Sequence, residues 1–180
     1  MHPNCIGHSI TVLGAVMGTE VEDFLVDMVP KQVAAERAFH QGDVEPRFAL
    51  WSRTDPLTLF GAKLSGTGWH ELSATFRTAA SWFSDSTEYD FEVVAAGVSG
   101  DLAYTVGYEH NQVNVHGQPQ TYTLRATHVY RREHGQWRIV HRHADVPPGQ
   151  NQIGGQAPSD LSDQRPTPLP PARADDVERT

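Results

Sequence analysis

The chain has 180 residues, enough for one domain with a sizeable core, and 38% of them are hydrophobic. Its formal net charge of -8 argues against nucleic acid or an anionic membrane as a partner, because both attract basic surfaces. The single cysteine, Cys5, excludes an internal disulfide and suits a reducing compartment, so we expect a cytoplasmic protein.

Residues 1–18 show neither a helix cap nor a sustained hydrophobic period, so we expect a disordered N-terminal extension there. The extension has a short apolar patch but lacks the basic region of a signal peptide, and the patch is too short to span a bilayer. We therefore expect neither a leader nor a membrane anchor. Met17 lies directly before the first predicted helix and is an alternative candidate for the translation start.

Helical spacing begins at Thr19, which forms a capping box with Glu22. The apolar residues that follow at helical intervals are Val21, Phe24, Leu25 and Met28. Pro30 falls inside this run and has no amide proton to donate, so the sequence predicts a break there. A second helix is then expected over residues 30–41.

Four further elements precede the region of strands. A short helix is predicted over residues 46–51, and Asp55–Pro56 favours an extended entry into a short strand over 57–61. The glycines in 66–68 mark a loop. Apolar residues then recur at a spacing of three and four, which predicts a helix that faces the core. They are Trp69, Leu72, Phe76, Ala79, Ala80 and Phe83.

From Glu88 onward the hydrophobic period changes to two, which predicts strands. Their expected ranges are 89–96, 102–112, 122–131 and 137–145, with turns at 99–101, at 116–119 and near Gly135. Helices followed by an uninterrupted run of strands indicate an α+β fold, with the helices on one face of a curved antiparallel sheet. After Pro147 the chain is rich in proline, glycine and polar residues. We therefore expect one domain over 19–147 and a disordered tail over 148–180.

Several motifs are similar to those of one known family. They are Gly42–Asp43, Ala49–Ser52 (ALWS), Asp55–Gly61 (DPLTLFG), Gly68–Trp69, Gly100–Glu109 (GDLAYTVGYE) and Leu124–Asp145 (LRATHVYRREHGQWRIVHRHAD). Through them residues 19–147 resemble a SnoaL-like domain of the NTF2-like superfamily, which is related to ketosteroid isomerase. The resemblance implies a cone, in which a curved antiparallel sheet wraps around N-terminal helices. It leaves the reaction open, because this fold hosts isomerases, cyclases, dehydratases, hydrolases and non-catalytic association domains.

The isomerase of that superfamily uses a carboxylate base and an oxyanion hole built from a tyrosine and a carboxylic acid. The resemblance puts Thr58 at the position of the base, Ala35 at that of the tyrosine and His128 at that of the acid. A threonine hydroxyl cannot shuttle a proton near neutral pH as a carboxylate does, and alanine donates nothing. We therefore expect no steroid isomerisation by that mechanism.

Alternation along the strands and the resemblance both predict a small-molecule pocket on the concave face of the sheet. The inward residues expected on the two central strands are Tyr104, Val106, Tyr108 and His110, and Leu124, Ala126, His128 and Tyr130. Trp51 and Phe60 are expected to close the pocket from the helical side. Such a pocket is amphipathic, with apolar walls around a few polar groups.

The final predicted strand, 137–145, has two interpretations. By apolarity alone the inward side chains are Trp137, Ile139, His141 and His143. The resemblance instead turns Val140, Arg142 and Ala144 toward the pocket. We favour this second interpretation, because relatives form dimers through the other face of the sheet, and we expect a homodimer. The expected dimer face is Trp137, Ile139, His141 and His143. Arg142 then either favours a ligand that bears a carboxylate or pairs with a neighbouring carboxylate.

His141, His143 and Asp145 also form a pattern that suits zinc or iron, since residues two apart on a strand share a face. A role in hydrogen bonding or at a dimer face is commoner for such a pair, and the family that the chain resembles generally works without metal. We therefore expect no metal and no cofactor. Cys5 lies outside the predicted core and has no evident base partner, so thiol catalysis is not expected.

Two functional hypotheses remain. In the first, the domain is a cofactor-independent enzyme of the isomerase, cyclase or dehydratase type. His128, polarised by Tyr104 or Tyr108, then does acid–base work on an apolar carbonyl compound. In the second, it is a module for ligand binding or dimerisation without turnover. A histidine on an apolar face is more often a hydrogen-bonded core residue than a catalyst. The expected ligand is a small apolar or carboxylate-bearing molecule.

Overall fold

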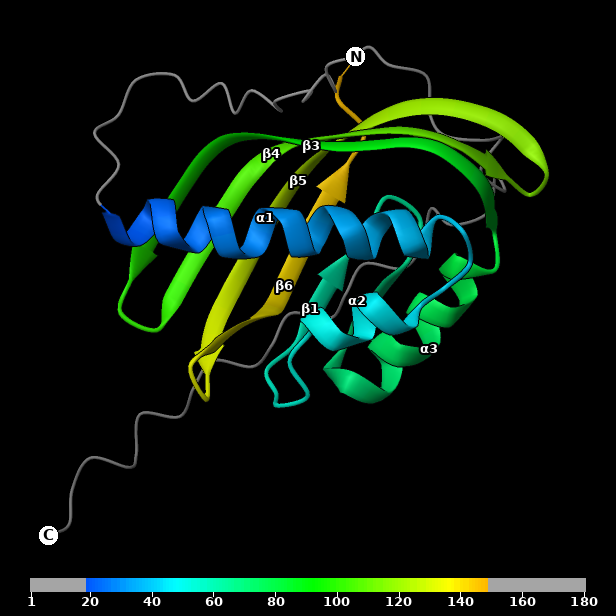
Figure 1. Ribbon diagram of the computed structural model, residues 1–180. Helices are drawn as coiled ribbons and strands as arrows, with labels where there is room; N and C mark the ends of the chain where they lie inside the picture. The colour runs from blue at the N-terminus through cyan, green and yellow to red at the C-terminus, as the bar shows by residue number, and fades with distance from the viewer. Residues whose placement is uncertain (1–18, 149–180) are drawn as a thin grey trace, which may run out of the picture.

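The computed structural model describes residues 19–148. The predicted N-terminal extension, the candidate start at Met17 and the tail from residue 149 onward lie outside the described residues. Figure 1 shows one long helix lying across the concave side of a curved sheet, with two shorter helices at one end. The predicted α+β cone is confirmed. None of the described helices combines the length and the apolar character that a bilayer crossing requires.

The long helix, α1, spans Thr19–Phe39, and its apolar stripe faces the sheet. The buried apolar residues of α1 are Phe24, Leu25, Met28, Ala35 and Phe39. The predicted break at Pro30 is wrong, because the helix continues through that residue. Pro30 and Val26, whose carbonyl loses its amide partner, both lie on the exposed side of α1. Water can bond to that carbonyl, so the proline costs the helix no buried unpaired group.

Two short helices close one end of the cone. The first, α2, spans Glu45–Leu50 as expected, and α3 spans Gly68–Ala80. The buried residues of α3 are Leu72, Phe76 and Ala80. Phe83 was predicted to lie on this helix, but it is the first residue of the next strand. From β3 it packs against the same core as α3 does, which is why its apolar side chain also fitted the helical spacing.

Six strands form one sheet in the order β2-β1-β6-β5-β4-β3. Their bounds are Thr58–Phe60 (β1), Ser65–Thr67 (β2), Phe83–Ser99 (β3), Leu102–Val115 (β4), Gln118–Glu133 (β5) and Gln136–Asp145 (β6). β1 and β6 are parallel and all other neighbours are antiparallel, so the sheet is mixed rather than purely antiparallel. The sequence did not predict β2, because this short segment has no apolar residue to reveal a period of two.

The hairpin turns of the sheet lie where the sequence predicted them. Two of them, at His116–Gly117 and His134–Gly135, have positive φ at both residues: 51° and 75° in the first, 50° and 77° in the second. Such turns match the right-handed twist of the strands that they join, and glycine at the second position adopts positive φ without steric strain. The strands extend beyond their predicted ranges at the ends near these turns, where polar residues obscure the alternation.

The core lies between α1 and the concave face of the sheet. Phe24 of α1 packs edge-on against Tyr130 of β5 and Trp137 of β6, with ring centroids 5.0 and 5.3 Å apart. A second, smaller cluster consists of Tyr89, Phe91, Leu124, Ala126 and Ala144. Burial of these side chains is the main force that holds the helix against the sheet. The same interior also contains polar side chains, and these define the candidate site.

Candidate functional site

Polar and charged side chains lie in the interior together with the apolar core. The buried ones are Gln32, Glu36, His40, Arg47, Ser52, Thr105, Glu109, Asn111, His128 and Arg142. Apart from His40, which directly follows α1, and Ser52, they come from α1, α2 and the inward faces of β4, β5 and β6. Buried polar groups are costly unless they are paired, so their partners decide what this interior can do.

Arg142 reaches the interior from β6 and pairs with Glu109 of β4. Its Nε lies 3.3 Å from Oε1 of Glu109, and its Nη2 donates to Oε2. Burial by itself lowers the pKa of Arg142, but the carboxylates of Glu109 and Glu36 outweigh burial and raise that pKa above its ordinary value. Of the two roles expected for Arg142, pairing with a neighbouring carboxylate is the one observed.

A second buried ion pair links the helices. Nε of Arg47 on α2 donates to Oε1 of Glu36 on α1 at 2.9 Å, and its Nη2 donates to Oε2. The Arg47 guanidinium also lies 3.3 Å from the centre of the Phe39 ring, a cation–π contact. This interior therefore holds two carboxylates and two guanidiniums, each paired with its opposite.

His128 lies on the inward face of β5, as the sequence predicted, with 1% of its surface exposed. Its Nε2 is 3.3 Å from the side-chain nitrogen of Gln32 and 3.7 Å from Oε1 of Glu109. The Gln32 amide nitrogen can only donate, so Nε2 accepts and the proton of the neutral ring resides on Nδ1. Burial, and then the Arg142 charge, hold the pKa of His128 well below its ordinary value, so the ring is neutral near pH 7.

Gln32 connects this histidine to a tyrosine. The Tyr130 hydroxyl donates to Oε1 of Gln32 at 2.5 Å and lies 3.2 Å from the hydroxyl of Thr105. Burial raises the pKa of Tyr130 above its ordinary value, so this hydroxyl keeps its proton. His128, Gln32 and Tyr130 thus form one continuous chain of hydrogen bonds across the interior.

Three buried atoms of this interior have no hydrogen-bond partner: Tyr89 Oη, Asn111 Oδ1 and His128 Nδ1. Tyr89 and Asn111 are directly paired across β3 and β4, so their side chains start on the same face about 5 Å apart. The ring of His128 lies 5.5 Å from that of Phe91, two residues along β3 from Tyr89. Each unpaired buried group costs about 1–3 kcal/mol, so each of the three calls for a partner.

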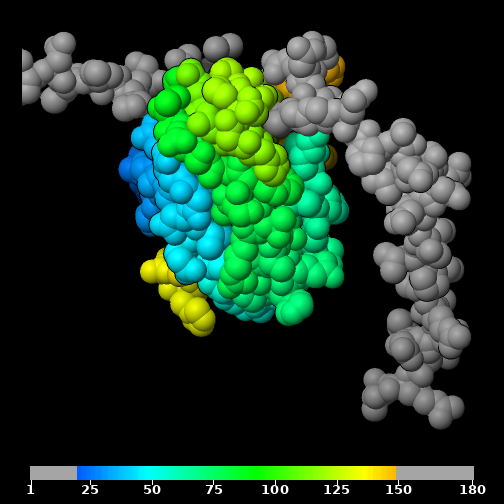
Figure 2. All heavy atoms as spheres, turned by 90° about the vertical axis from the view of Figure 1, so that its right-hand side faces the viewer, coloured from blue at the N-terminus to red at the C-terminus, as the bar shows by residue number. Residues whose placement is uncertain are grey.

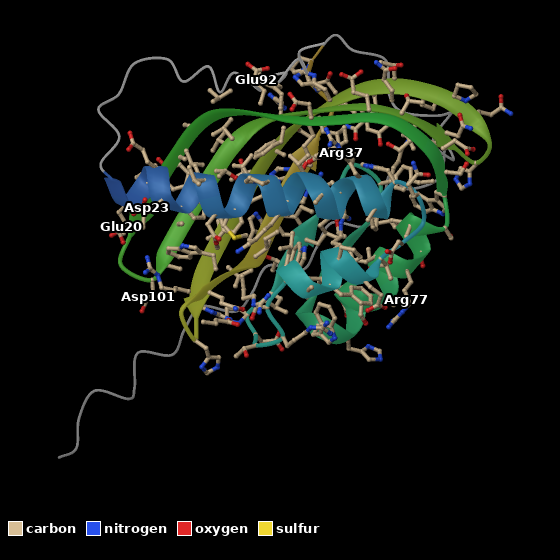
Figure 3. All side chains as sticks on the ribbon, viewed as in Figure 1. Glu20, Asp23, Arg37, Arg77, Glu92 and Asp101 are labelled. Atoms are coloured by element: carbon tan, nitrogen blue, oxygen red, sulfur yellow. The ribbon has the colours of Figure 1, made fainter. Side chains whose placement is uncertain are left out.

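A surface hollow of about 310 Å³ borders this region. Its lining residues are Arg37, Ala38, Gln41, Ser86, Thr87, Glu88 and Tyr89. Arg37 spans the gap between helix and sheet by donating to the backbone oxygen of Tyr89 from Nε and Nη2, at 3.3 and 3.2 Å (Figure 3). Figure 2 looks toward this end of the molecule, where the cyan end of α1 meets the green β3. Tyr89 belongs to both the hollow and the buried cluster.

The predicted inward face of β4 is wrong. The buried residues of this strand are Ala103, Thr105, Gly107, Glu109, Asn111 and Val113. The residues predicted to line a pocket, Tyr104, Val106, Tyr108 and His110, point to the outer face instead. The larger side chains of β4 are on its exposed face, which misled an assignment based on apolarity. Tyr104 therefore cannot polarise His128 as expected.

Phe60 also lies on the outer face, where its ring centroid is 5.6 Å from that of His141 and 6.0 Å from that of His143. Trp51, the other residue expected to close the pocket, is buried in the core against Phe76. Of the predicted site residues, the structure therefore brings His128, Tyr130 and Arg142 together in the interior. The other predicted pocket residues lie in the packed core or on the outer face.

A β-bulge in β6 explains why its two interpretations disagreed. Val129 pairs with His141 and Tyr130 pairs with Ile139, so Val140 is an extra residue without a partner on β5. Before it, Trp137 and Ile139 point inward, and after it Arg142 and Ala144 do. Trp137 and Ile139 are therefore core residues, which corrects their assignment to a dimer face. His141 and His143 do point outward.

Sequence reasoning missed most of the polar residues of the interior. Gln32 and Glu36 continue the four-residue spacing of Phe24 and Met28 along α1, so their burial could have been predicted from that stripe. Glu109, Asn111 and Tyr89 gave no such signal. Their inward orientation depends on the strand alternation, which was assigned to the wrong face on β4.

The residues at the isomerase positions do not form a comparable site. Thr58 accompanies His141 on the outer face, where its hydroxyl lies 2.7 Å from His141 Nδ1, and Ala35 is buried in the core. In the part of the chain that the structure describes, no three histidine, cysteine, aspartate or glutamate side chains are arranged to hold a metal ion. Asp145, considered with His141 and His143, is hydrogen-bonded to Arg125.

Fold and site together define a small α+β cone with a partly polar interior. The family model described as a SnoaL-like domain matches residues 33–148, which include all of the sheet and the C-terminal third of α1. The chain belongs to this family of SnoaL-like domains, within the NTF2-like fold. A search of curated proteins gives no match.

Solved structures support the same fold. A Thiobacillus denitrificans protein, described as a proposed calcium/calmodulin-dependent protein kinase type II association domain, is 22% identical with a TM-score of 0.56, over 65% of this chain and 92% of its own. An NTF2-like protein of unknown function in nutrient uptake from Rhodospirillum rubrum is 19% identical with a TM-score of 0.55, over 67% and 98%. A proposed NTF2-like dehydratase from Streptomyces avermitilis is 18% identical with a TM-score of 0.57, over 70% and 97%. Similarity at this level concerns the fold alone.

Proposed function

We propose that this domain binds a small molecule in the polar interior between α1 and the sheet. The observation that carries the proposal is the set of three unpaired buried atoms, Tyr89 Oη, Asn111 Oδ1 and His128 Nδ1. Native interiors rarely leave such groups unpaired, and a bound molecule with matching polar groups supplies the missing partners. The apolar side chains around them supply contact area for its carbon skeleton.

The hollow beside Tyr89 supports a route of access. It lies at the junction of α1 and β3, where the pairing of β3 with β4 is irregular between Ser84 and Glu88. Fewer ladder hydrogen bonds hold the chain there, so this end of the cone opens at lower cost than the continuous ladder of β4 and β5.

Acid–base turnover in the same interior is a second candidate. It is favoured by the position of His128, whose neutral ring lies 3.7 Å from the Glu109 carboxylate and can exchange protons through Nδ1. Its polarising neighbours are then Gln32 and Glu109 rather than Tyr104. One structural neighbour is described as a proposed dehydratase, and dehydration is a reaction of this class. The lowered pKa of His128 makes it a weak base, so binding remains the first proposal.

Homodimerisation through the outer face of the sheet is also proposed, with a composition that differs from the sequence expectation. In the described residues, six large hydrophobic side chains are exposed, and five of them lie on that face. They are Phe60, Val94, Leu102, Tyr104 and Val106. A concentration of exposed apolar side chains on one face is typical of an interaction surface.

A thermal-shift screen of the full chain tests the binding proposal. The probes are a steroid ketone, a hydroxyanthraquinone and small aromatic carboxylates, each at several concentrations. A molecule that binds only the folded state at 100 times its Kd adds about 2.7 kcal/mol and raises Tm by several degrees.

The matched variants are His128→Ala in the interior and His110→Ala on the outer face. We expect the first to abolish the shift and the second to preserve it. A shift that survives His128→Ala places the ligand elsewhere and contradicts the proposal. Turnover assays of each stabilising probe then separate binding from catalysis, because a catalyst loses rate in His128→Ala while its fold stays intact.

A further inference from the structure

We propose that the molecule bound in this interior is electrically neutral and carries both a hydrogen-bond acceptor and a hydrogen-bond donor, as a carboxamide or a hydroxyketone does. This inference rests on the proposed function and concerns the chemical class of the ligand. It replaces the expectation of a carboxylate-bearing ligand, which depended on a free Arg142.

The first argument is the charge balance of the interior. Glu36 is paired with Arg47, and Glu109 is paired with Arg142, so the two carboxylates and the two guanidiniums cancel. The buried histidines add no charge near neutral pH, because burial lowers the pKa of His40 to about 4 and that of His128 well below its usual value. The interior thus already has zero net charge without a ligand.

An anionic ligand would disturb this balance. Neither Arg47 nor Arg142 is available to it without giving up a carboxylate, and a displaced carboxylate would itself be buried and unpaired. Burying one uncompensated charge costs several kcal/mol even after relaxation. A neutral ligand has no such cost, so charge alone favours it strongly over an anion of the same shape.

The second argument is the chemistry of the unpaired atoms. The Tyr89 hydroxyl can donate, and burial keeps it protonated by raising its pKa well above the ordinary value. Because Nε2 of His128 accepts from Gln32, its Nδ1 also presents a proton. Asn111 Oδ1 can only accept, since its amide nitrogen already donates to the Glu109 backbone oxygen. The site therefore offers two donors and one acceptor.

A carbonyl oxygen has two lone pairs and accepts from donors such as these, and an N–H or O–H of the ligand donates to an acceptor such as Asn111 Oδ1. A carboxamide carries these groups on adjacent atoms, and a hydroxyketone carries them a bond or two apart. A carboxylate has acceptors only, so it would leave Asn111 Oδ1 unpaired and face its lone pairs. Hydrogen bonding and charge therefore favour the same class of ligand, a neutral molecule with both a donor and an acceptor.

Titration calorimetry with two matched pairs of probes tests this inference on the full chain. The pairs are benzamide with benzoate, and naphthamide with naphthoate, at pH 7.5. Within each pair the shape is conserved and only the charge and the donor differ. We expect the amide of at least one pair to bind with a Kd at least tenfold lower than its carboxylate.

Two variants assign the preference to the residues named. Tyr89→Phe removes one donor and should weaken amide binding by about tenfold, whereas Tyr104→Phe, the same change on the outer face, should leave it unchanged. Glu109→Gln leaves Arg142 without its carboxylate and should invert the preference toward the carboxylates. Far-UV circular dichroism checks the folding of each variant. If Glu109→Gln does not fold, the comparison of Tyr89→Phe with Tyr104→Phe still tests whether an interior donor contributes to amide binding.

The outcomes separate the two proposals. Tighter binding of the carboxylates to the native chain overturns the inference about charge but supports an interior binding site. Amide binding that is equal in Tyr89→Phe and Tyr104→Phe overturns the assignment of the donor. If neither amides nor carboxylates bind, this inference fails, whereas the proposed function fails only if the thermal-shift screen with the steroid ketone and the hydroxyanthraquinone also gives no shift.

Discussion

At the level of single residues, His40 makes the stability of the domain depend on pH. Its ring packs edge-on against Phe83 with centroids 4.7 Å apart and also contacts Phe39 and Tyr89. Burial lowers the pKa of His40 to about 4. An unfolded chain protonates this histidine below about pH 6.5, whereas the folded state does so only near pH 4, so acid favours unfolding.

His40→Phe should therefore reduce the pH dependence of stability. Between pH 7.5 and pH 5 the native chain loses about 2 kcal/mol of unfolding free energy through His40, and the variant does not. Phenylalanine retains the aromatic packing, so the two chains should be similarly stable at pH 7.5. Urea unfolding at both pH values measures the difference. Parallel losses in the two chains would show that the imidazole titrates normally in the fold.

Residues of the interior differ in how far the sequence could predict them. The inward position of His128 followed from the alternation of β5. The four-residue spacing on α1 predicts the burial of Gln32 and Glu36, but a polar side chain does not by itself mark a core position. The pairing of Glu109 with Arg142 could not be predicted, because it joins two strands that are not neighbours in the sheet.

Among the elements, α1 shows how a helix tolerates a proline. Pro30 lies on the exposed side of the helix and leaves one carbonyl facing water. The proline still removes one helical hydrogen bond and crowds the preceding turn. We therefore expect Pro30→Ala to raise the free energy of unfolding by about 2 kcal/mol, which is less than the full cost of proline because the unfolded chain gains freedom.

Urea denaturation, with far-UV circular dichroism of the folded state, measures this effect. Unchanged helical content with a higher urea midpoint is the expected result. A less stable Pro30→Ala chain would contradict this expectation and would mean that proline stabilises α1 in its packed position.

The hairpins were predictable and the irregular strand was not. Gly117 and Gly135 marked their turns because only a few residue types tolerate positive φ. The bulge at Val140 has no such sequence signal, since valine is a common strand residue on either side of a sheet. The alternation of apolar residues identified the inward side chains of the first half of β6, Trp137 and Ile139. The resemblance to the family identified those of the second half, Arg142 and Ala144.

At the scale of the whole molecule, the outer face of the sheet governs self-association in our proposal. Glu92, which marks this face in Figure 3, projects from the sheet on the side away from α1. Val106, on β4, is 37% exposed on this face. A charge buried there against a second copy has no partner, so Val106→Glu should convert the expected dimer into a monomer.

Val26→Glu provides the matched control, because Val26 is 70% exposed on α1, on the opposite side of the molecule. Sedimentation equilibrium of the native chain and both variants gives their masses. We expect dimers for the native chain and Val26→Glu. A monomeric native chain, or a dimeric Val106→Glu chain, would contradict a dimer through this face.

The fold was predictable from the sequence to a far greater degree than the site. Helical spacing followed by alternation predicted the cone, and the similarity of GDLAYTVGYE and the β5–β6 hairpin to SnoaL-like domains identified the family. The site depends on which of two faces each strand buries, and a shift of one residue exchanges them completely. β4 was assigned one residue out of phase, and this single error moved four predicted pocket residues to the outside.

The extra residue in β6 has a consequence for comparing this chain with its relatives. A relative without a counterpart of Val140 would have an uninterrupted alternation, and its inward side chains would still correspond to Trp137, Ile139, Arg142 and Ala144. An alignment gap therefore belongs at Val140. Placing it in the turn at His134–Gly135 instead would match Trp137 and Ile139 with solvent-facing positions of the relative, and would hide the equivalence of the two cores.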